Sequence, residues 1–192
     1  MITKTKRQKR RKNPVLKSRV DEILTELNPL YVMYLAEGDY AEIYKFAIDK
    51  NEEIENVILK KGTYVIKFLK IGEVFNDQDI SYLKKLSKLK VIPRIYVITK
   101  KYMIMDFIKA DTLRYRLDRM EHPGKKLRLI MNLQRMIDRL HDKGIAHGDL
   151  HFENVLIDEN DDLYLIDPVT NSKNFDDDLK RFDNYRRIYL DE

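Results

Sequence analysis

The feature that most constrains the fold lies late in the chain, in residues 145–168, IAHGDLHFENVLIDENDDLYLIDP. Two short alternating runs, VLID and LYLID, flank the polar sequence ENDD, and this pattern predicts a tight β-hairpin. A hairpin folds back on itself, so a side chain just before its first strand lies near one just after its second. Asn154 and Asp167 have these two positions. The sequence therefore predicts an amide and a carboxylate close together at one end of a hairpin.

Oxygen atoms of this kind suit Mg²⁺, which takes a few hard oxygen ligands together with phosphate. Asp149, on the segment that leads into the hairpin, would stand beside such an ion and could orient a hydroxyl group and accept its proton. Two other interpretations stay open on these residues alone. Asp and Asn also cap ordinary turns, and His147, Asp149 and His151 could form an H-x-D-x-H metal cluster. Gly148 and the polar flanks favour a loop, which speaks against that cluster.

The first half of the chain predicts antiparallel strands with one inserted helix. Two runs rich in aromatic and β-branched residues meet at Gly38 in LYVMYLAEGDYAEIYKFAID and predict a hairpin. After a polar stretch, TYVIKFLK predicts a third strand, and residues 77–90 then predict a helix with one apolar face. RIYVIT and KYMIMDFI pair naturally across Lys100. We therefore expect five strands, with a helix after the third.

Helices dominate the rest of the chain. Asn13-Pro14 is a helix start, and the KKLRLIMNLQRMIDRLHDKG run predicts a helix that ends at Gly144. A last helix is predicted over 179–190. We therefore expect an α+β fold with four parts: a disordered basic tail (1–12), an N-terminal helix (13–29), a five-stranded N-terminal lobe (30–108) and a short, mainly helical C-terminal lobe (109–192).

The formal net charge of +5 is concentrated in the tail. MITKTKRQKRRK holds seven Lys or Arg and no acid, and the other 30 basic residues nearly balance the 32 acidic ones. Such a tail can bind RNA, a ribosome, an anionic membrane or an acidic protein through counterion release, or it is simply a solubilising end. No aromatic residue is interleaved with its charges, so base stacking has no support.

The composition excludes several classes of protein. With 43% hydrophobic residues the chain is that of a folded protein, and with no cysteine it has neither disulfides nor thiol catalysis. The absence of cysteine fits a reducing compartment, so we expect a cytoplasmic location. No apolar run reaches the length of a membrane span, and the basic N-terminus lacks the apolar segment of a secretory signal.

Residues 145–168 resemble the catalytic loop and metal-binding hairpin of the protein kinase-like superfamily. HGDLHFEN is similar to H-R-D-L-x-x-x-N, and IDP stands at the metal-binding Asp-Phe-Gly. Upstream, LAEGDYAEIYKF resembles the Gly-rich loop G-x-G-x-x-G-x-V, and YVIKFL resembles the V-A-I-K strand. The resemblance covers roughly residues 30–170. It implies a two-lobed kinase-like fold with ATP and Mg²⁺ as cofactors.

The resemblance also implies roles for single residues. Asp149 would be the catalytic base, Lys67 would neutralise the ATP phosphates, and Asn154 and Asp167 would hold Mg²⁺, while His147 packs the loop. Asp79 falls by register at the helix glutamate that pairs with the lysine; Glu73 as its substitute, or no pair at all, are the alternatives. The nucleotide would lie against residues of the Gly-rich loop, the gatekeeper position and the hinge, namely Ala36, Gly38, Ala41, Ile43, Met105, Asp106 and Ile108.

Several departures limit the resemblance. Gly148 replaces the arginine of His-Arg-Asp, which receives an activation-loop phosphate, and Pro168-Val169 replace Phe-Gly. Because 25 residues follow Asp167, there is no room for a full activation segment, and we expect no switching by loop phosphorylation. Asp177 or Asp178 is expected to anchor the catalytic loop from below, as the family's later helix does.

The HGDLH form is seen in aminoglycoside- and choline-kinase-like enzymes and in small atypical protein kinases, RIO-like ones among them. The small-molecule enzymes enclose their substrate in added C-terminal helices, for which this chain has no room. We therefore expect a minimal serine/threonine kinase that moves the γ-phosphate of Mg-ATP to a protein hydroxyl. The alternatives are a kinase for a sugar, an aminoglycoside or a lipid headgroup, and a pseudokinase that acts as a binding module.

Overall fold

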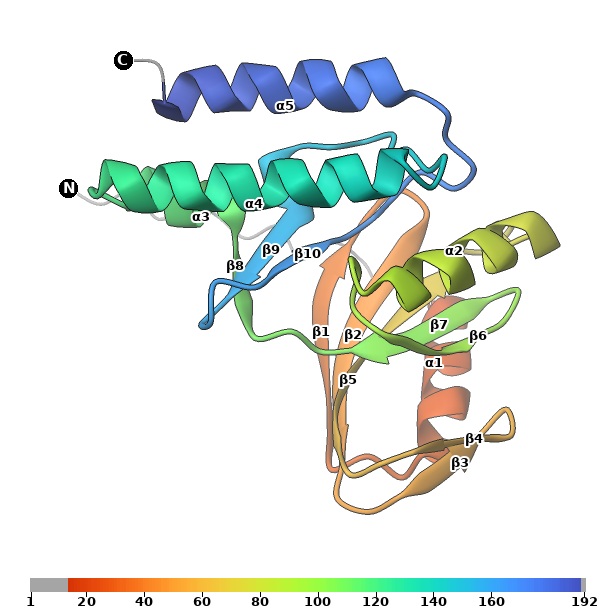
Figure 1. Cartoon of the computed structure of the whole chain (residues 1–192). Helices are drawn as coiled ribbons and strands as arrows, with labels where there is room; N and C mark the ends of the chain where they lie inside the picture. The colour runs from red at the N-terminus through yellow and green to blue at the C-terminus, as the bar shows by residue number, and fades with distance from the viewer. Residues whose placement is uncertain (1–13, 191–192) are drawn as a thin grey trace.

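A five-stranded antiparallel sheet forms the N-terminal lobe in the computed structural model, which describes residues 14–190 (Figure 1). Its order confirms the predicted α+β lobe, because the two hairpins and the third strand join one sheet with antiparallel neighbours throughout. Strand β5 lies at its centre and pairs Lys67 with Ile43 on one side and with Met103 on the other. In spatial order the strands are β1 (Tyr31–Glu37), β2 (Ala41–Ile48), β5 (Gly62–Leu69), β7 (Tyr102–Asp106) and β6 (Ile95–Ile98).

The polar stretch before β5 folds into a small extra hairpin, which the sequence reading missed. It consists of β3 (Glu52–Ile54) and β4 (Val57–Leu59). Glu55 and Asn56 both have positive φ, at 50° and 59°, the backbone of a two-residue turn that matches the twist of a hairpin. Three-residue strands carry too short an alternation to be recognised.

Helices cover both faces of the sheet. α1 (Pro14–Glu26) is the predicted N-terminal helix, and Val20 and Leu24 on it are buried in one cluster with Phe46, Ile66 and Ile104 of the sheet. α2 (Asp77–Leu89) is the predicted inserted helix and buries its apolar face in a second cluster. The N-terminal cap at Asn13 and the basic tail lie outside the described residues.

The C-terminal lobe combines helices with a small sheet. Residues 110–118 form β8 (Ala110–Thr112) and α3 (Leu113–Asp118), and the predicted hairpin forms β9 (Val155–Asp158) and β10 (Leu163–Leu165), which with β8 make a three-stranded sheet. A 3₁₀ turn, η1 (Phe152–Asn154), precedes β9. The two long helices, α4 (Pro123–His141) and α5 (Phe175–Leu190), lie side by side (Figure 1).

The boundaries of the two long helices differ slightly from prediction. α4 ends at His141 instead of Gly144, and Gly144 occupies the following turn with φ +67°. α5 begins at Phe175, four residues before the predicted start, with three aspartates in its first turn, where the helix dipole favours negative charge.

The second hydrophobic cluster joins the two lobes. It runs from α2 through α4 to the hairpin β9–β10. The Tyr82 hydroxyl of α2 donates to the Ala146 carbonyl at 2.8 Å, and the Leu165 amide donates to the Val91 carbonyl at 2.8 Å. These contacts hold the end of the hairpin beside the sheet. Among residues 14–190, no helix has the length and apolar character needed to cross a bilayer.

Candidate active site

The segment between α4 and β9, residues 147–154, is held from below by one buried carboxylate. The amides of His147 and Gly148 donate to the carboxylate of Asp178 at 2.6 and 2.9 Å, and His141 Nε2 lies 3.1 Å from it. Asp178 is 1% exposed and lies in the first turn of α5. The prediction that Asp177 or Asp178 anchors this loop is confirmed for Asp178.

His147 is a structural residue of the loop. Its Nε2 lies 3.0 Å from the Ile166 carbonyl, an acceptor, so the ring proton is on Nε2. Burial lowers the pKa of this imidazole below its ordinary value, so the ring is neutral near pH 7. Within the described part of the chain His147, Asp149 and His151 do not form a metal cluster, so the H-x-D-x-H alternative has no support.

Gly148 occupies a position where any side chain would strain the backbone and overlap its neighbours. Its φ is +80°, and a Cβ built there would lie 2.6 Å from the Cβ and Oγ of Ser172 and 2.9 Å from Cβ of Val169. The segment after the hairpin is fixed in this place, since the Val169 amide donates to the His147 carbonyl at 2.8 Å. The segment at 169–172 therefore takes the space that the family's arginine side chain would need.

Asp149 is surrounded by three groups that can hydrogen-bond to its carboxylate. Asn154 Nδ2 donates to Oδ2 at 3.2 Å, His151 Nε2 lies 3.5 Å from the same atom, and Arg181 Nη1 donates to Oδ1 at 3.0 Å. The Asp149 side chain is 43% exposed, so a reactant can reach it. The surrounding donors fix the direction of a carboxylate that stays open to solvent.

Arg181 was not predicted from the sequence. Its guanidinium bridges two acids, because Nε donates to Asp177 at 2.7 Å while Nη1 reaches Asp149. The i, i+4 spacing from Asp177 was a readable signal for a pair on one helix. Its meeting with Asp149 depends on how α5 packs under the loop, which local sequence does not show.

The hairpin brings Asn154 and Asp167 to one end, as predicted. The Ile166 amide donates to the Asn154 carbonyl at 2.9 Å, which places Asp167 one residue further along. Asn154 turns its amide nitrogen to Asp149, so Oδ1 has no donor among the described residues. That oxygen and the carboxylate of Asp167, whose side chain is 44% exposed, are of the chemical type that could hold a divalent cation.

Lys67 binds Asp167 instead of an acid on α2. The Nζ–Oδ1 distance is 2.5 Å, and the lysine side chain is only 19% exposed. The predicted pair with Asp79 was wrong, because Asp79 caps its own helix: its Oδ2 accepts from the Asn76 amide at 3.0 Å, and its Oδ1 accepts from Asn171 at 3.2 Å. Glu73 forms no ion pair with Lys67 in residues 14–190 either.

A mainly apolar cavity of about 240 Å³ opens beside this ion pair, between the two lobes. It collects six of the residues assigned to the nucleotide, namely Ala36, Ile43, Lys67, Met105, Asp106 and Ile108, together with Asp167, which was assigned to the cation. Gly38 and Ala41 do not line it. Gly38 sits in the β1–β2 turn, where its amide donates to the Ala41 carbonyl, and Ala41 is 3% exposed in the core. Lining residues that the sequence reading missed include Val65, Met103, Leu156 and Leu165.

Two lobes joined at an apolar cavity, with a lysine on the central strand and an Asp-to-Asn loop before a hairpin, define a member of the protein kinase-like superfamily. Residues 38–174 match the RIO domain, and the chain belongs to this family of atypical protein kinases.

Curated relatives carry protein kinase names. A protein of Acanthamoeba polyphaga mimivirus named as a serine/threonine-protein kinase is 27% identical over 123 residues, which are 64% of this chain and 23% of that protein. Cyclin-dependent kinase 1 of Encephalitozoon cuniculi is 25% identical over 143 residues, or 69% of this chain and 47% of the relative. CBL-interacting serine/threonine-protein kinase 5 of Arabidopsis thaliana is 34% identical over 70 residues, which are 36% of this chain and 16% of that protein. The chain spans less than half the length of each of these relatives.

Proposed function

We propose that this chain is a minimal protein kinase that transfers the γ-phosphate of Mg-ATP to a serine or threonine hydroxyl. The observation that carries the proposal is a pair of features. Lys67 and Asp167 form an ion pair in a cavity lined by both lobes. The hairpin that joins Asn154 to Asp167 brings the Asp149–Asn154 loop next to that pair. Two of the relatives are named as serine/threonine-protein kinases, which supports a protein as the acceptor.

The residues present fit Mg-ATP. Apolar side chains of both lobes, among them Ile43, Met105 and Leu156, form walls for a flat base. Lys67 places a compact positive charge at the same cavity, suited to phosphates. Asn154 Oδ1 and Asp167 would hold Mg²⁺, which neutralises charge on the phosphates when bound.

The protein's own part in the transfer is to position groups and to accept a proton. Asp149 Oδ, directed by Asn154 and Arg181, would take the proton of the attacking hydroxyl. With 43% of its side chain exposed, Asp149 can meet a hydroxyl carried on the surface of another protein. Binding the reactants side by side supplies the remaining acceleration.

The test is incorporation of label from γ-labelled ATP with Mg²⁺, with dephosphorylated casein as acceptor and with the chain alone. Asp149→Asn should lower incorporation by about 10²- to 10⁴-fold, the usual contribution of a general base. Asp138→Asn, at an exposed position of α4, is the matched control and should leave incorporation unchanged.

A second variant examines the cation site. Asp167→Asn should abolish Mg²⁺-dependent ATP binding, measured by calorimetry, because one of two candidate ligands loses its charge. Incorporation that survives in both variants would refute the assignment of the site. Tight Mg-ATP binding by the wild-type chain without any labelled protein would refute a protein acceptor.

A further inference from the structure

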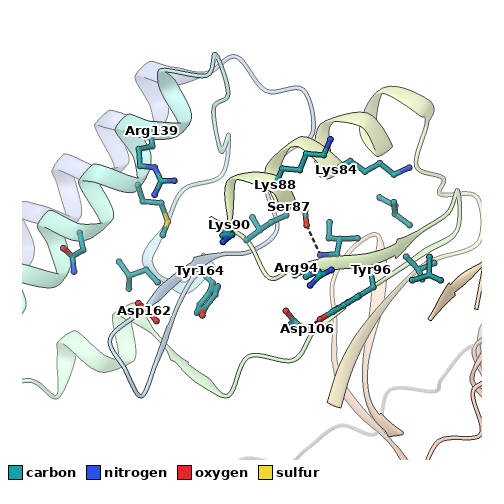
Figure 2. A pocket seen from close by; sticks show the side chains of 18 of the residues that line it. Lys84, Ser87, Lys88, Lys90, Arg94, Tyr96, Asp106, Arg139, Asp162 and Tyr164 are labelled. Atoms are coloured by element: carbon teal, nitrogen blue, oxygen red, sulfur yellow. Dashed lines mark hydrogen bonds between the residues drawn. The ribbon is translucent and has the colours of Figure 1, made fainter. Parts of the chain in front are cut away.

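A second and larger hollow, about 1070 Å³, lies between the lobes along α2 and the edge strand β6 (Figure 2). We call it the basic groove, and it is lined by residues of α2, β6, α4 and the β9–β10 turn. In Figure 2 Arg139 lies on one side and Lys84 and Lys88 on the other, with Lys90 and Arg94 between them. It shares Ile92, Ile95 and Asp106 with the nucleotide cavity, so the two hollows are neighbours.

The positive charges of the basic groove have no acidic partner in the part of the chain that the structure describes. Arg135 binds the Asn132 side chain, Arg139 the Leu89 carbonyl, and Arg94 lies over the Tyr96 ring at 4.8 Å. Within residues 14–190 no carboxylate forms an ion pair with any of the six cations that line the groove. These are Lys84, Lys88, Lys90, Arg94, Arg135 and Arg139.

Four acids among the described residues also line the groove, and one of them is neutralised by an arginine outside it. Asp161 pairs with Arg128 at 2.5 Å, and Asp106 accepts a hydrogen bond from the Tyr96 hydroxyl at 2.8 Å. Glu55 accepts from Tyr102 at 3.2 Å. Within residues 14–190, six cations line the groove against three acids without an ion pair, Glu55, Asp106 and Asp162. The groove therefore keeps a surplus of positive charge on a concave surface, where the field of like charges is focused on an anionic ligand.

Strand β6 adds a second recognition element. It is the edge of the five-stranded sheet, and all four of its residues, Ile95–Ile98, line the groove. The Ile95 amide is taken by Ser87 Oγ at 3.0 Å, as the dashed line in Figure 2 shows. Further along the edge, backbone groups can pair with an added strand, a common way of binding an extended peptide.

We propose that the basic groove binds an extended, acidic segment of a protein, which lies along β6 and sets its Asp and Glu side chains against the six cations. A polypeptide fits better than a nucleic acid for two reasons. The strand edge offers main-chain hydrogen bonds that only a peptide can complete. Asp106 and Asp162 also lie in the groove, where an unbroken row of phosphates would meet them, whereas a peptide can place neutral residues there.

The test is direct binding to the full chain, measured by fluorescence anisotropy, and it does not depend on phosphotransfer. The probe is a labelled twelve-residue peptide in which Asp and Glu alternate with Val and Thr. The test variant is Lys84→Glu with Arg135→Glu, one change on each wall of the groove. The matched control, Lys85→Glu with Lys125→Glu, makes the same charge change on the same two helices outside the groove.

The test variant should bind the peptide about tenfold more weakly than wild type, since two attractive charges become repulsive, while the control changes by less than about twofold. Both variants keep the basic tail, so a tail effect cancels. Equal weakening in the two variants, or none, would overturn the proposal. So would a twelve-nucleotide single-stranded RNA that binds more tightly than the peptide and loses affinity in the test variant alone. Retained Mg-ATP binding in the test variant shows that it is folded.

Discussion

The loop at residues 147–154 and the β1–β2 hairpin are built in opposite ways. The loop backbone is pinned at His147 and Gly148 by a buried carboxylate, and its neighbours leave no free volume. Every residue of β1, in contrast, is exposed, and its large apolar and aromatic residues range from Tyr34 at 38% to Met33 at 52%. The strand also carries a bulge between Tyr34 and Ala36. The groups assigned to proton and cation chemistry stand on the rigid side. Strand β1, which lines the cavity through Leu35 and Ala36, is the one strand of the described five-stranded sheet without a buried residue.

The largest effect on stability is expected at Gly148 in the 147–154 loop. Gly148→Ala should destabilise the protein by about 3 kcal/mol, because the left-handed backbone costs 1–2 kcal/mol for a residue with a Cβ and the added methyl overlaps Ser172. The measurement is urea unfolding. Gly148→Ala with Ser172→Gly should recover part of the loss. A loss below about 1 kcal/mol would mean that the 169–172 segment moves easily and that the loop is less rigid than described.

Removing the anchor of the loop should be nearly as costly. Asp178→Asn leaves one acceptor for two buried amide donors and removes a charge, so the free energy of unfolding should fall by about 2 kcal/mol. Asp176→Asn, an exposed neighbour in the same helical turn, should change it by less than about 0.5 kcal/mol. Equal effects in the two variants would show that the helix start, and not the loop anchor, is what was lost.

Removing the contact of Arg181 with Asp149 tests whether the rigidity of the loop matters for turnover. Arg181→Ala should lower kcat for labelled phosphate transfer by about tenfold, because Asp149 loses one of its directing donors, with KM for ATP unchanged. Arg181→Lys should restore part of the lost kcat, since lysine keeps the charge but not the forked geometry. Arg187→Ala, exposed on the same helix, is the control. A change in KM alone would assign Arg181 to substrate binding instead.

The smallest effect is expected in the hairpin. Gly38 has no heavy atom within 4 Å of a built Cβ and does not line the cavity. Gly38→Ala should therefore alter the free energy of unfolding by less than about 0.5 kcal/mol and leave the KM for ATP unchanged. A large rise in KM would show that the hairpin closes over the phosphates during binding.

Alternating runs of four or more residues were sufficient to predict the main sheet and the hairpin that joins Asn154 to Asp167. The alternation of apolar and polar side chains shows which face of a strand is buried. This pattern lies within the sequence of each strand, so it can be recognised without knowing the rest of the fold. The β3–β4 hairpin was missed because three residues give too little periodicity. Its turn at Glu55-Asn56 adopts positive φ without glycine, so the usual signal was absent.

Long-range placement explains the other differences. The Lys67 partner was assigned by counting along α2, but the Asn76-x-x-Asp79 pattern is itself a helix cap and uses both Asp79 oxygens locally or with Asn171. That signal was readable in the sequence. The Arg181–Asp149 contact was not, because it joins residues 32 positions apart through the packing of α5 under the loop.

The crowding around Gly148 has a consequence for engineering this fold. An arginine at position 148, which many kinases use to sense a phosphate, would need the space that Val169 and Ser172 now fill. It would also require the backbone at this position to change from its positive φ to a negative one. Each single change meets an occupied neighbour, so the path to a phosphate-responsive loop crosses poorly folded intermediates. A gain of that control in the laboratory should require exchange of the whole 148–172 segment.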